Sequence, residues 1–161
     1  MAIDFDSMDL LDASLDDLSD RPAFQPFPNG AHICSMYWDA EMNEAGTRMN
    51  VIKLKLVYVE LGELADTNAK VPEKDDKMTL NMYQFNKDKK TGEEVPSEFG
   101  QGAFKDILRF LRPIVGGDTQ KEIMKNSQGG QFLFVIKNRK SKDKDGIERI
   151  NTDITAISEK P

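Results

Sequence analysis

The sequence has no long apolar segment and no basic residue near its start. No apolar run approaches the roughly eighteen residues that a helix needs to cross a bilayer. The opening residues, MAIDFDSMDLL, contain acids where a secretory signal has a positively charged region. We therefore expect a cytoplasmic protein with neither a membrane-spanning helix nor a secretory leader.

Cysteine and histidine occur once each, as Cys34 and His32. One cysteine excludes an intramolecular disulfide and fits a reducing compartment. A zinc site needs several ligands, and no others stand at ligand spacing, so we predict no metal centre. Nothing resembling a nucleophile elbow or an oxyanion loop accompanies the pair. We expect His32 at a strand edge or on the surface, and Cys34 as a partly buried structural thiol.

Two further motifs lack the residues that their chemistry requires. Gly100 and Gly102 in FGQGAF do not have the spacing of a phosphate-binding loop, and no strand–helix–strand unit surrounds them. The segment KDKDG (142–146) lacks the later acids of a calcium-binding loop, above all the final glutamate. The sequence therefore predicts a protein that is not an enzyme and that holds no cofactor or metal.

Positive charge is missing from the first part of the chain and concentrated later. The net charge is −6, but residues 1–20 contain seven aspartates and no lysine or arginine. Removing these seven charges leaves a net charge of +1 for residues 21–161. Because salt screens each charge beyond roughly 8–10 Å, an acidic chain can still carry a local basic surface. The overall charge therefore does not exclude a polyanionic ligand.

The acidic segment has apolar residues at spacings of three and four, an amphipathic pattern that is compatible with a helix. These residues are Phe5, Met8, Leu11, Leu15 and Leu18. The next segment, RPAFQPFPNG, contains three prolines and a glycine, which end any helix. We expect an acidic arm over residues 1–22 and one domain over residues 23–161. The arm either binds a protein partner through its apolar side chains or only adds solubility.

Five segments of the domain have the pattern of strands and two have helical periodicity. The clearest strand is 48–61, in which Lys53 and Lys55 alternate with apolar residues. The expected strands are 31–42, 48–61, 78–85, 131–140 and 147–157, and the expected helices are 103–113 and 119–127. Three strands, a helical insert and a hairpin follow the order of the OB-fold, a five-stranded Greek-key barrel. We predict a mainly β, OB-type barrel with the helical insert between strands three and four; a mixed α+β sheet of different topology is the alternative.

The expected sheet combines basic and aromatic side chains, which single-strand binding needs for backbone phosphates and for base stacking. Lysines alternate outward on the second strand, and aromatic residues do so on the third. The candidate DNA-binding residues are Lys53, Lys55, Tyr83, Phe85, Trp38, Lys137, Arg139, Lys140, Lys142 and Arg149. They fall on the strand 2–3 face and near the 4–5 turn, which OB-folds use to bind oligonucleotides.

These candidates also have simpler interpretations. The two lysines of the second strand can simply face water, and the two aromatic residues of the third can pack beneath the loop at 86–98. Trp38 and Tyr37 lie on opposite faces of one strand, so only one of them is expected to face DNA.

Three segments are similar to a known family. LDDLSDRPAFQPFPNGAH (15–32), FGQGAFKDILRFL (99–111) and FVIKNRKSKDKDGIERINTDI (134–154) resemble parts of small OB-fold single-stranded DNA-binding proteins of tailed bacteriophages. The resemblance extends over residues 15–157. It implies sequence-independent binding of single-stranded DNA, which protects single strands during phage replication or recombination in the cytoplasm of a bacterial host.

Two other functions fit the same sequence. A protein-interaction adaptor would act through the acidic arm, and replication or recombination proteins are the partners that we expect for that arm. A phage assembly protein would use the same barrel as a scaffold and would form a stable homo-oligomer without DNA. A homo-oligomer is also compatible with DNA binding.

Overall fold

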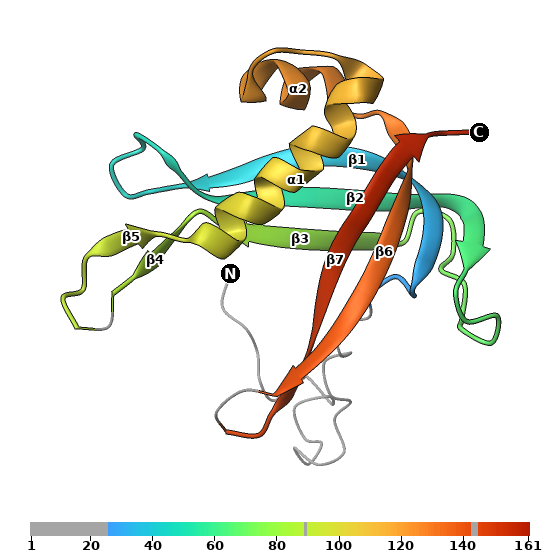
Figure 1. Cartoon of the computed structure of the whole chain (residues 1–161), viewed down its shortest axis with the longest axis horizontal. Helices are drawn as coiled ribbons and strands as arrows, with labels where there is room; N and C mark the ends of the chain where they lie inside the picture. The colour runs from blue at the N-terminus through green and yellow to red at the C-terminus, as the bar shows by residue number, and fades with distance from the viewer. Residues whose placement is uncertain (1–25, 89, 143–144) are drawn as a thin grey trace, which may run out of the picture.

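The structure of the protein is a computed structural model that describes residues 26–88, 90–142 and 145–161. These residues form seven strands and two helices (Figure 1). The elements are β1 (Gly30–Met42), β2 (Met49–Leu64), β3 (Lys77–Tyr83), β4 (Phe85–Lys87), β5 (Glu94–Pro96), α1 (Glu98–Val115), α2 (Gln120–Ser127), β6 (Gln131–Lys142) and β7 (Glu148–Glu159). The expected acidic arm lies outside the described residues, so its role stays a prediction.

Five strands form one antiparallel sheet in the order β3-β2-β1-β6-β7, and β4 pairs with β5 in a separate hairpin. The prediction of a mainly β fold is confirmed, with helices between the third strand and a final hairpin. Closure into a barrel does not follow from this pairing. Among the described residues, β3 pairs only with β2 and β7 pairs only with β6.

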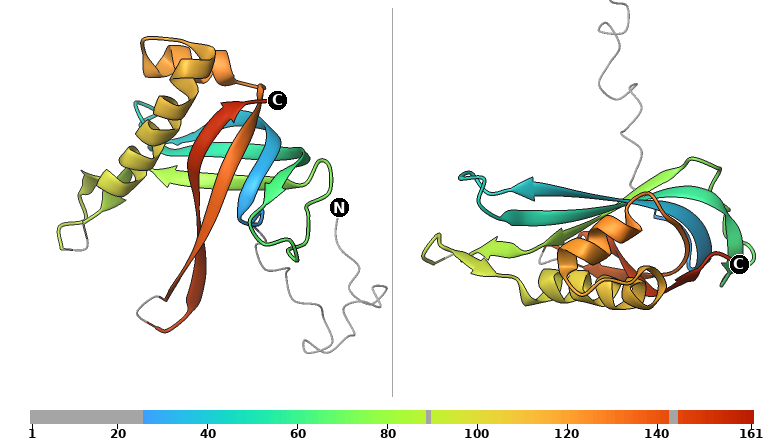
Figure 2. Two further views of the ribbon diagram at one scale, coloured as in Figure 1. Left: turned by 45° about the vertical axis from the view of Figure 1, so that its right-hand side comes forward. Right: turned by 90° about the horizontal axis from the view of Figure 1, so that it is seen from above.

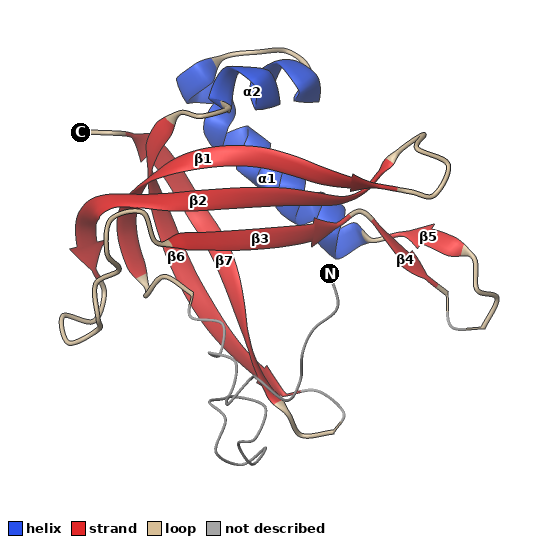
Figure 3. Ribbon diagram, turned by 180° about the vertical axis from the view of Figure 1, so that it is seen from behind, coloured by secondary structure: helices blue, strands red, loops and turns tan. Residues whose placement is uncertain are grey.

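The sheet bends strongly, so that β6 and β7 cross over β1, β2 and β3 (Figures 1 and 2). Helix α1 lies on the same side as β7 and packs on the inner face of the sheet. The view from behind shows β1, β2 and β3 in front of both helices (Figure 3). Both helices in the described part of the chain thus lie on the other side of these three strands.

The core lies between the inner face of the sheet and helix α1. The inward residues of β2 from Ile52 to Tyr58 are almost completely buried, whereas Lys53 and Lys55 lie on the opposite face. Helix α1 adds a stripe of buried residues at helical spacing: Phe104, Ile107, Leu108 and Leu111. Burial of each such side chain contributes about 1.5–3 kcal/mol. Because alternate residues of β2 are buried in this core, the face that carries Lys53 and Lys55 is the one available for contacts with other molecules.

Helix α1 begins earlier than the pattern over 103–113 predicts, because Ser97 caps it. The Ser97 Oγ accepts a hydrogen bond from the Gly100 N–H at 3.3 Å. The helix ends at Gly116, whose φ of 72° is a conformation that glycine adopts readily. No helix in the described part of the chain is both long and apolar enough to cross a membrane.

The residues after α2 cover a section of β1 that β6 does not reach. Met36 exchanges backbone hydrogen bonds with Gly129 and Gly130, at 2.8 and 2.9 Å. The side-chain amide of Gln128 bonds both backbone groups of Trp38, at 2.5 and 3.2 Å. These contacts hold the end of α2 on the sheet and extend the hydrogen bonding of β1 beyond β6 as far as Trp38.

Candidate nucleic-acid interface

The outer face of β2 carries Lys53 and Lys55, and both have acidic partners on β1. The Nζ of Lys53 lies 2.6 Å from Glu41, and the Nζ of Lys55 lies 3.4 Å from Asp39. The hydrogen bond to Glu41 raises the pKa of Lys53. The backbone N–H of Ala40 and, next, the Lys55 ammonium lower the pKa of Asp39. Both lysines are therefore paired with acids of β1, which neutralise much of their field.

Tyr83 lies on the same outer face at the end of β3. It stands opposite Val51 in the sheet register, and 53% of its surface is exposed. Its hydroxyl is close enough to Lys53 to raise the pKa of that lysine further. An exposed ring beside a cation on an edge strand has the properties that base stacking needs.

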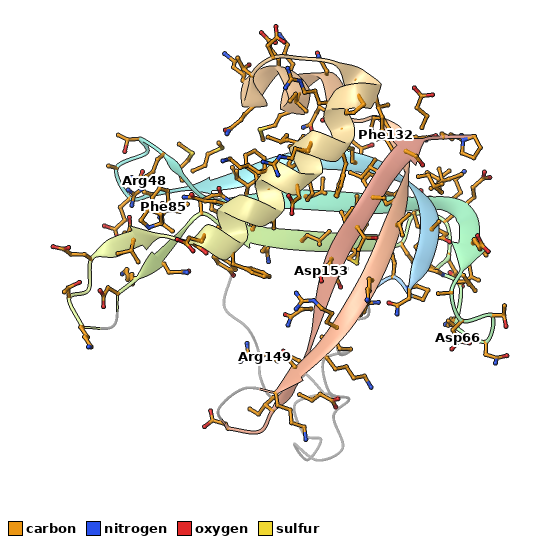
Figure 4. All side chains as sticks on the ribbon, viewed as in Figure 1. Arg48, Asp66, Phe85, Phe132, Arg149 and Asp153 are labelled. Atoms are coloured by element: carbon orange, nitrogen blue, oxygen red, sulfur yellow. The ribbon has the colours of Figure 1, made fainter. Side chains whose placement is uncertain are left out.

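Phe85 follows in β4, and one face of its ring is covered by Arg48. The guanidinium carbon lies 3.9 Å from the ring centroid, a cation–π distance. Arg48 also pairs with Glu94 and donates to Asn50 at 3.2 Å, and Asn50 donates to Glu94 at 3.3 Å. This cluster ties the β1–β2 turn to the β4–β5 hairpin (Figure 4).

Arg48 is a candidate contact that the sequence pattern did not indicate. It is the first residue of the expected strand 48–61 but precedes β2 in the structure, and it is not on the face that Lys53 and Lys55 share in that strand's alternation. Its side chain is 38% exposed while it rests on Phe85. A guanidinium plane stacks on nucleobases as aromatic rings do. The Arg48 guanidinium is therefore a further candidate for the stacking role that the sequence suggested for Phe85.

The β6–β7 hairpin extends away from the body of the sheet and carries the second group of candidates (Figures 1 and 4). Arg139 forms a forked ion pair with Asp153, with Nη2 to Oδ1 at 3.2 Å, and this contact raises the pKa of Arg139. Lys140 lies 4.0 Å from Glu148. Two of the basic residues are therefore engaged with acids of the neighbouring strand.

Lys137 and Lys142 are exposed and form no ion pair with another described residue. Arg149 is also exposed and stands opposite Ser141 in the register of the hairpin. In the register of the hairpin, Lys142 lies opposite Glu148 near the tip, whereas Lys137 lies opposite Asp153, next to the section that pairs with β1. Among the candidate lysines, those that form no ion pair with another described residue therefore lie on the hairpin and not on β2.

Trp38 does not take part in such a surface. It is 9% exposed, its Nε1 donates to the Ser127 Oγ at 2.9 Å, and its ring stands edge-on to Phe104 with centroids 5.7 Å apart. The prediction that Trp38 stacks on bases is wrong, because its ring fills the space beneath α1 and α2. Tyr37, on the opposite face of β1, is 43% exposed.

His32 and Cys34 lie in the core. The His32 Nε2 lies 2.6 Å from the Pro28 carbonyl oxygen, and its Nδ1 lies 3.1 Å from the Tyr58 hydroxyl. Burial lowers the pKa of His32 and raises the pKa of the Cys34 thiol to about 12. The prediction of a strand-edge or surface histidine is wrong, because His32 is buried on the central strand β1; Cys34, expected to be partly buried, is completely buried. Within the described ranges, no cluster of three or more His, Cys, Asp or Glu residues is arranged to hold a metal ion.

A groove of about 670 Å³ separates the two groups of candidates. It lies between β3, α1 and β7, where the two outer edges of the sheet do not pair. Its lining includes Leu80, Phe99, Phe110, Arg139, Ile150 and Asn151. One wall of the groove is thus the edge of the strand that carries Tyr83, and the opposite wall belongs to the basic hairpin.

No family model matches this chain, and no curated protein matches it either. The similarity to phage single-stranded DNA-binding proteins is therefore without support from these comparisons. The exposed Tyr83, the lysines beside it and the projecting basic hairpin are the features on which a function has to rest.

Proposed function

We propose that the protein binds single-stranded DNA without sequence preference. The observation that supports this most is the strand order β3-β2-β1-β6-β7 with helices between β3 and β6. This order brings an uncovered face with lysines and a tyrosine into the same sheet as a projecting basic hairpin. OB-folds bind oligonucleotides with their strand 2–3 face and the flanking loops.

The proposal includes an OB-type barrel that is open between β3 and β7. OB-folds are partly open Greek-key barrels, so incomplete pairing at this position agrees with the class. Helix α1 would then be the helix that covers one end of the barrel. The β4–β5 hairpin and α2 are additions to the five strands and single helix of this scheme.

Each part of the surface has a role in the proposed complex. Tyr83 and the Arg48 guanidinium stack on bases, while Lys137, Lys142 and Arg149 contact phosphates. On β2, a phosphate replaces the carboxylate of Glu41 or Asp39 as the partner of a lysine. That exchange breaks the existing ion pair, so we expect each contact on β2 to contribute less to the free energy of binding than a contact of Lys137 or Lys142.

The biological role that fits this activity is the protection of single strands during phage replication or recombination, in the cytoplasm of a bacterial host. Stacking is sequence-tolerant because every base has a π face, and phosphate contacts do not distinguish bases. A surface built from these contacts therefore suits coating of single strands of any sequence.

The proposal is tested by fluorescence anisotropy with a labelled single strand of about 30 bases, longer than the roughly 4–16 nucleotides that one OB-fold covers. We expect saturable binding that weakens with salt and is competed by unlabelled single strands but not by duplex. Lys137→Glu with Lys142→Glu is expected to weaken binding more than tenfold at low salt.

The matched control is Lys121→Glu with Lys125→Glu. Both lysines are exposed on α2, at the end of the molecule remote from the hairpin (Figure 1). This variant changes the net charge by the same amount and is expected to bind within about twofold of the unmodified protein. Equal losses of affinity in the two variants would show that binding depends on the overall charge and not on the hairpin. Absence of binding at low salt would reject the proposal and favour the adaptor function of the arm.

A further inference from the structure

The groove between β3, α1 and β7 is lined by apolar side chains, some of which are well exposed. Phe99 is 75% exposed and Ile150 is 44% exposed, although both line the same groove. Phe110 and Leu80 lie deeper in it and are half-buried. A contiguous apolar surface of this kind on a monomer usually marks a contact with another segment or molecule.

The backbone around the groove is also incomplete. β3 and β7 form its two walls, and in the described part of the chain neither strand has a partner on the side that faces the groove. Unpaired strand edges attract extended peptide. An occupant of the groove would therefore meet both apolar side chains and free backbone groups.

The described chain begins at the rim of this groove. The Phe27 N–H donates to the Met78 Sδ at 3.4 Å, and the Phe27 carbonyl accepts from the Asn138 Nδ2 at 2.9 Å. Asn138 in turn accepts from the Thr152 Oγ1 at 2.7 Å. Met78 directly precedes the β3 wall of the groove, and Thr152 belongs to its β7 wall. Phe27 is thus held beside both walls, and the N-terminal segment is covalently joined to the chain at this point.

We propose that the N-terminal segment, residues 1–25, docks into this groove of its own chain. It contains apolar residues at regular spacing (Phe5, Met8, Leu11, Leu15 and Leu18), which match the apolar lining. Twenty-five residues extend up to roughly 80–90 Å, and α1 along the groove measures about 27 Å, so the segment reaches every part of it.

Charge and tethering favour this occupant over a free partner. The seven aspartates of residues 1–20 would lie beside a hairpin on which Lys137 and Lys142 have no acidic partner among the described residues. A short tether gives an effective concentration in the millimolar range, so even a weak contact is formed much of the time. This inference concerns the chain alone and does not depend on DNA binding.

The test places a nitroxide spin label in the groove of the full chain, at Asn151→Cys on the β7 wall. Cys34 is buried with a pKa of about 12, so a thiol-reactive label selects the introduced cysteine. With the active label, we expect the amide NMR signals of residues 3–18 to fall below about half of the intensity that they have when the label is reduced. The same label at Lys121→Cys, on the exposed surface of α2, is expected to leave those signals unchanged.

A second variant keeps the fold and removes the apolar lining. Phe99→Asp with Ile150→Asp changes two exposed side chains and is expected to restore the signals of residues 3–18 in the labelled chain. Unchanged signals in the first experiment, or persistent broadening in this variant, would overturn the proposal. Mixing isotope-labelled chains with separate spin-labelled chains tests the tether. Broadening between different molecules as strong as within one would show that the occupant is a second copy.

Discussion

The carbonyl oxygen of Tyr83 lies so close to Gly100 that a Cβ at Gly100 would stand 1.7 Å from it. Gly100 is the third residue of α1, and Tyr83 is the last residue of β3. The contact is supported by Gln84, whose side chain donates to the Gly100 carbonyl at 3.3 Å. The end of the strand that carries Tyr83 is therefore set by the start of the helix.

Gly100→Ala is expected to destabilise the protein by about 1–3 kcal/mol or more, because strand and helix must separate to admit the methyl group. Gly102→Ala is the control: it lies in the same helix, and nothing lies within 4 Å of the Cβ that it would gain. That variant is expected to be more stable by about 0.5–1 kcal/mol. Urea unfolding measures both, and equal effects would contradict the proposed contact.

Tyr83→Ala is expected to weaken binding of single-stranded DNA by about 5-fold to 150-fold, the loss of one stacked base. Tyr83→Phe keeps the ring and removes only the hydroxyl, so we expect binding close to that of the unmodified protein. Anisotropy titrations at one salt concentration compare the three proteins. If both substitutions weaken binding equally, the hydroxyl and not the ring makes the contact.

Lys137→Gln with Lys142→Gln is expected to reduce the salt dependence of binding as well as the affinity. Each phosphate contact on a single strand contributes about 0.7 to the slope of log K against log salt, so two lost contacts remove about 1.4. Lys121→Gln with Lys125→Gln on α2 is expected to leave the slope unchanged. Titrations at several salt concentrations give the slopes. An unaltered slope in the hairpin variant would exclude these lysines from phosphate contacts.

His32 is expected to make the protein less stable in mild acid. Burial lowers its pKa below the ordinary value of 6.5, so the unfolded chain binds a proton more readily than the folded one. The stabilising contribution is complete above pH 6.5 and is lost as the pH falls through the lowered pKa of the folded state. His32→Gln cannot take up this proton. The difference in unfolding free energy between the two proteins is therefore expected to shrink from about pH 7 to about pH 5.

Parallel stability curves for the two proteins would contradict this expectation. Asp39 also has a lowered pKa and loses stability in acid, but it is present in both proteins and cancels in the difference. The measurement is urea unfolding at several pH values.

The period-two pattern predicted the long strands because one face of each strand is buried. For β2, the alternation identified Lys53 and Lys55 as outward residues, and both lie on the outer face. Alternation alone does not say which face of β1 turns inward. Trp38 and Tyr37 were therefore equivalent in the sequence, and the contacts of Trp38 with Ser127 and Phe104 decide between them.

Tertiary contacts explain what the sequence pattern missed. The β4–β5 hairpin lies in a segment of charged residues with a proline, and it is tied to the sheet by Arg48 and Glu94. His32 is polar, but it is buried because Pro28 and Tyr58 satisfy its two ring nitrogens. The spacing of residues along the chain indicates neither the contacts of the β4–β5 hairpin nor the partners of His32.

The arrangement of strand edges has a consequence for the behaviour of the protein at high concentration. The outer edges of the sheet, on β3 and β7, face each other across the groove, and residues 128–130 cover β1 around Met36 and Trp38. Long exposed edges are the places where sheets of different molecules join and grow into aggregates. Because these edges face each other within one molecule, we expect the protein to resist precipitation by intermolecular β-pairing when it is concentrated.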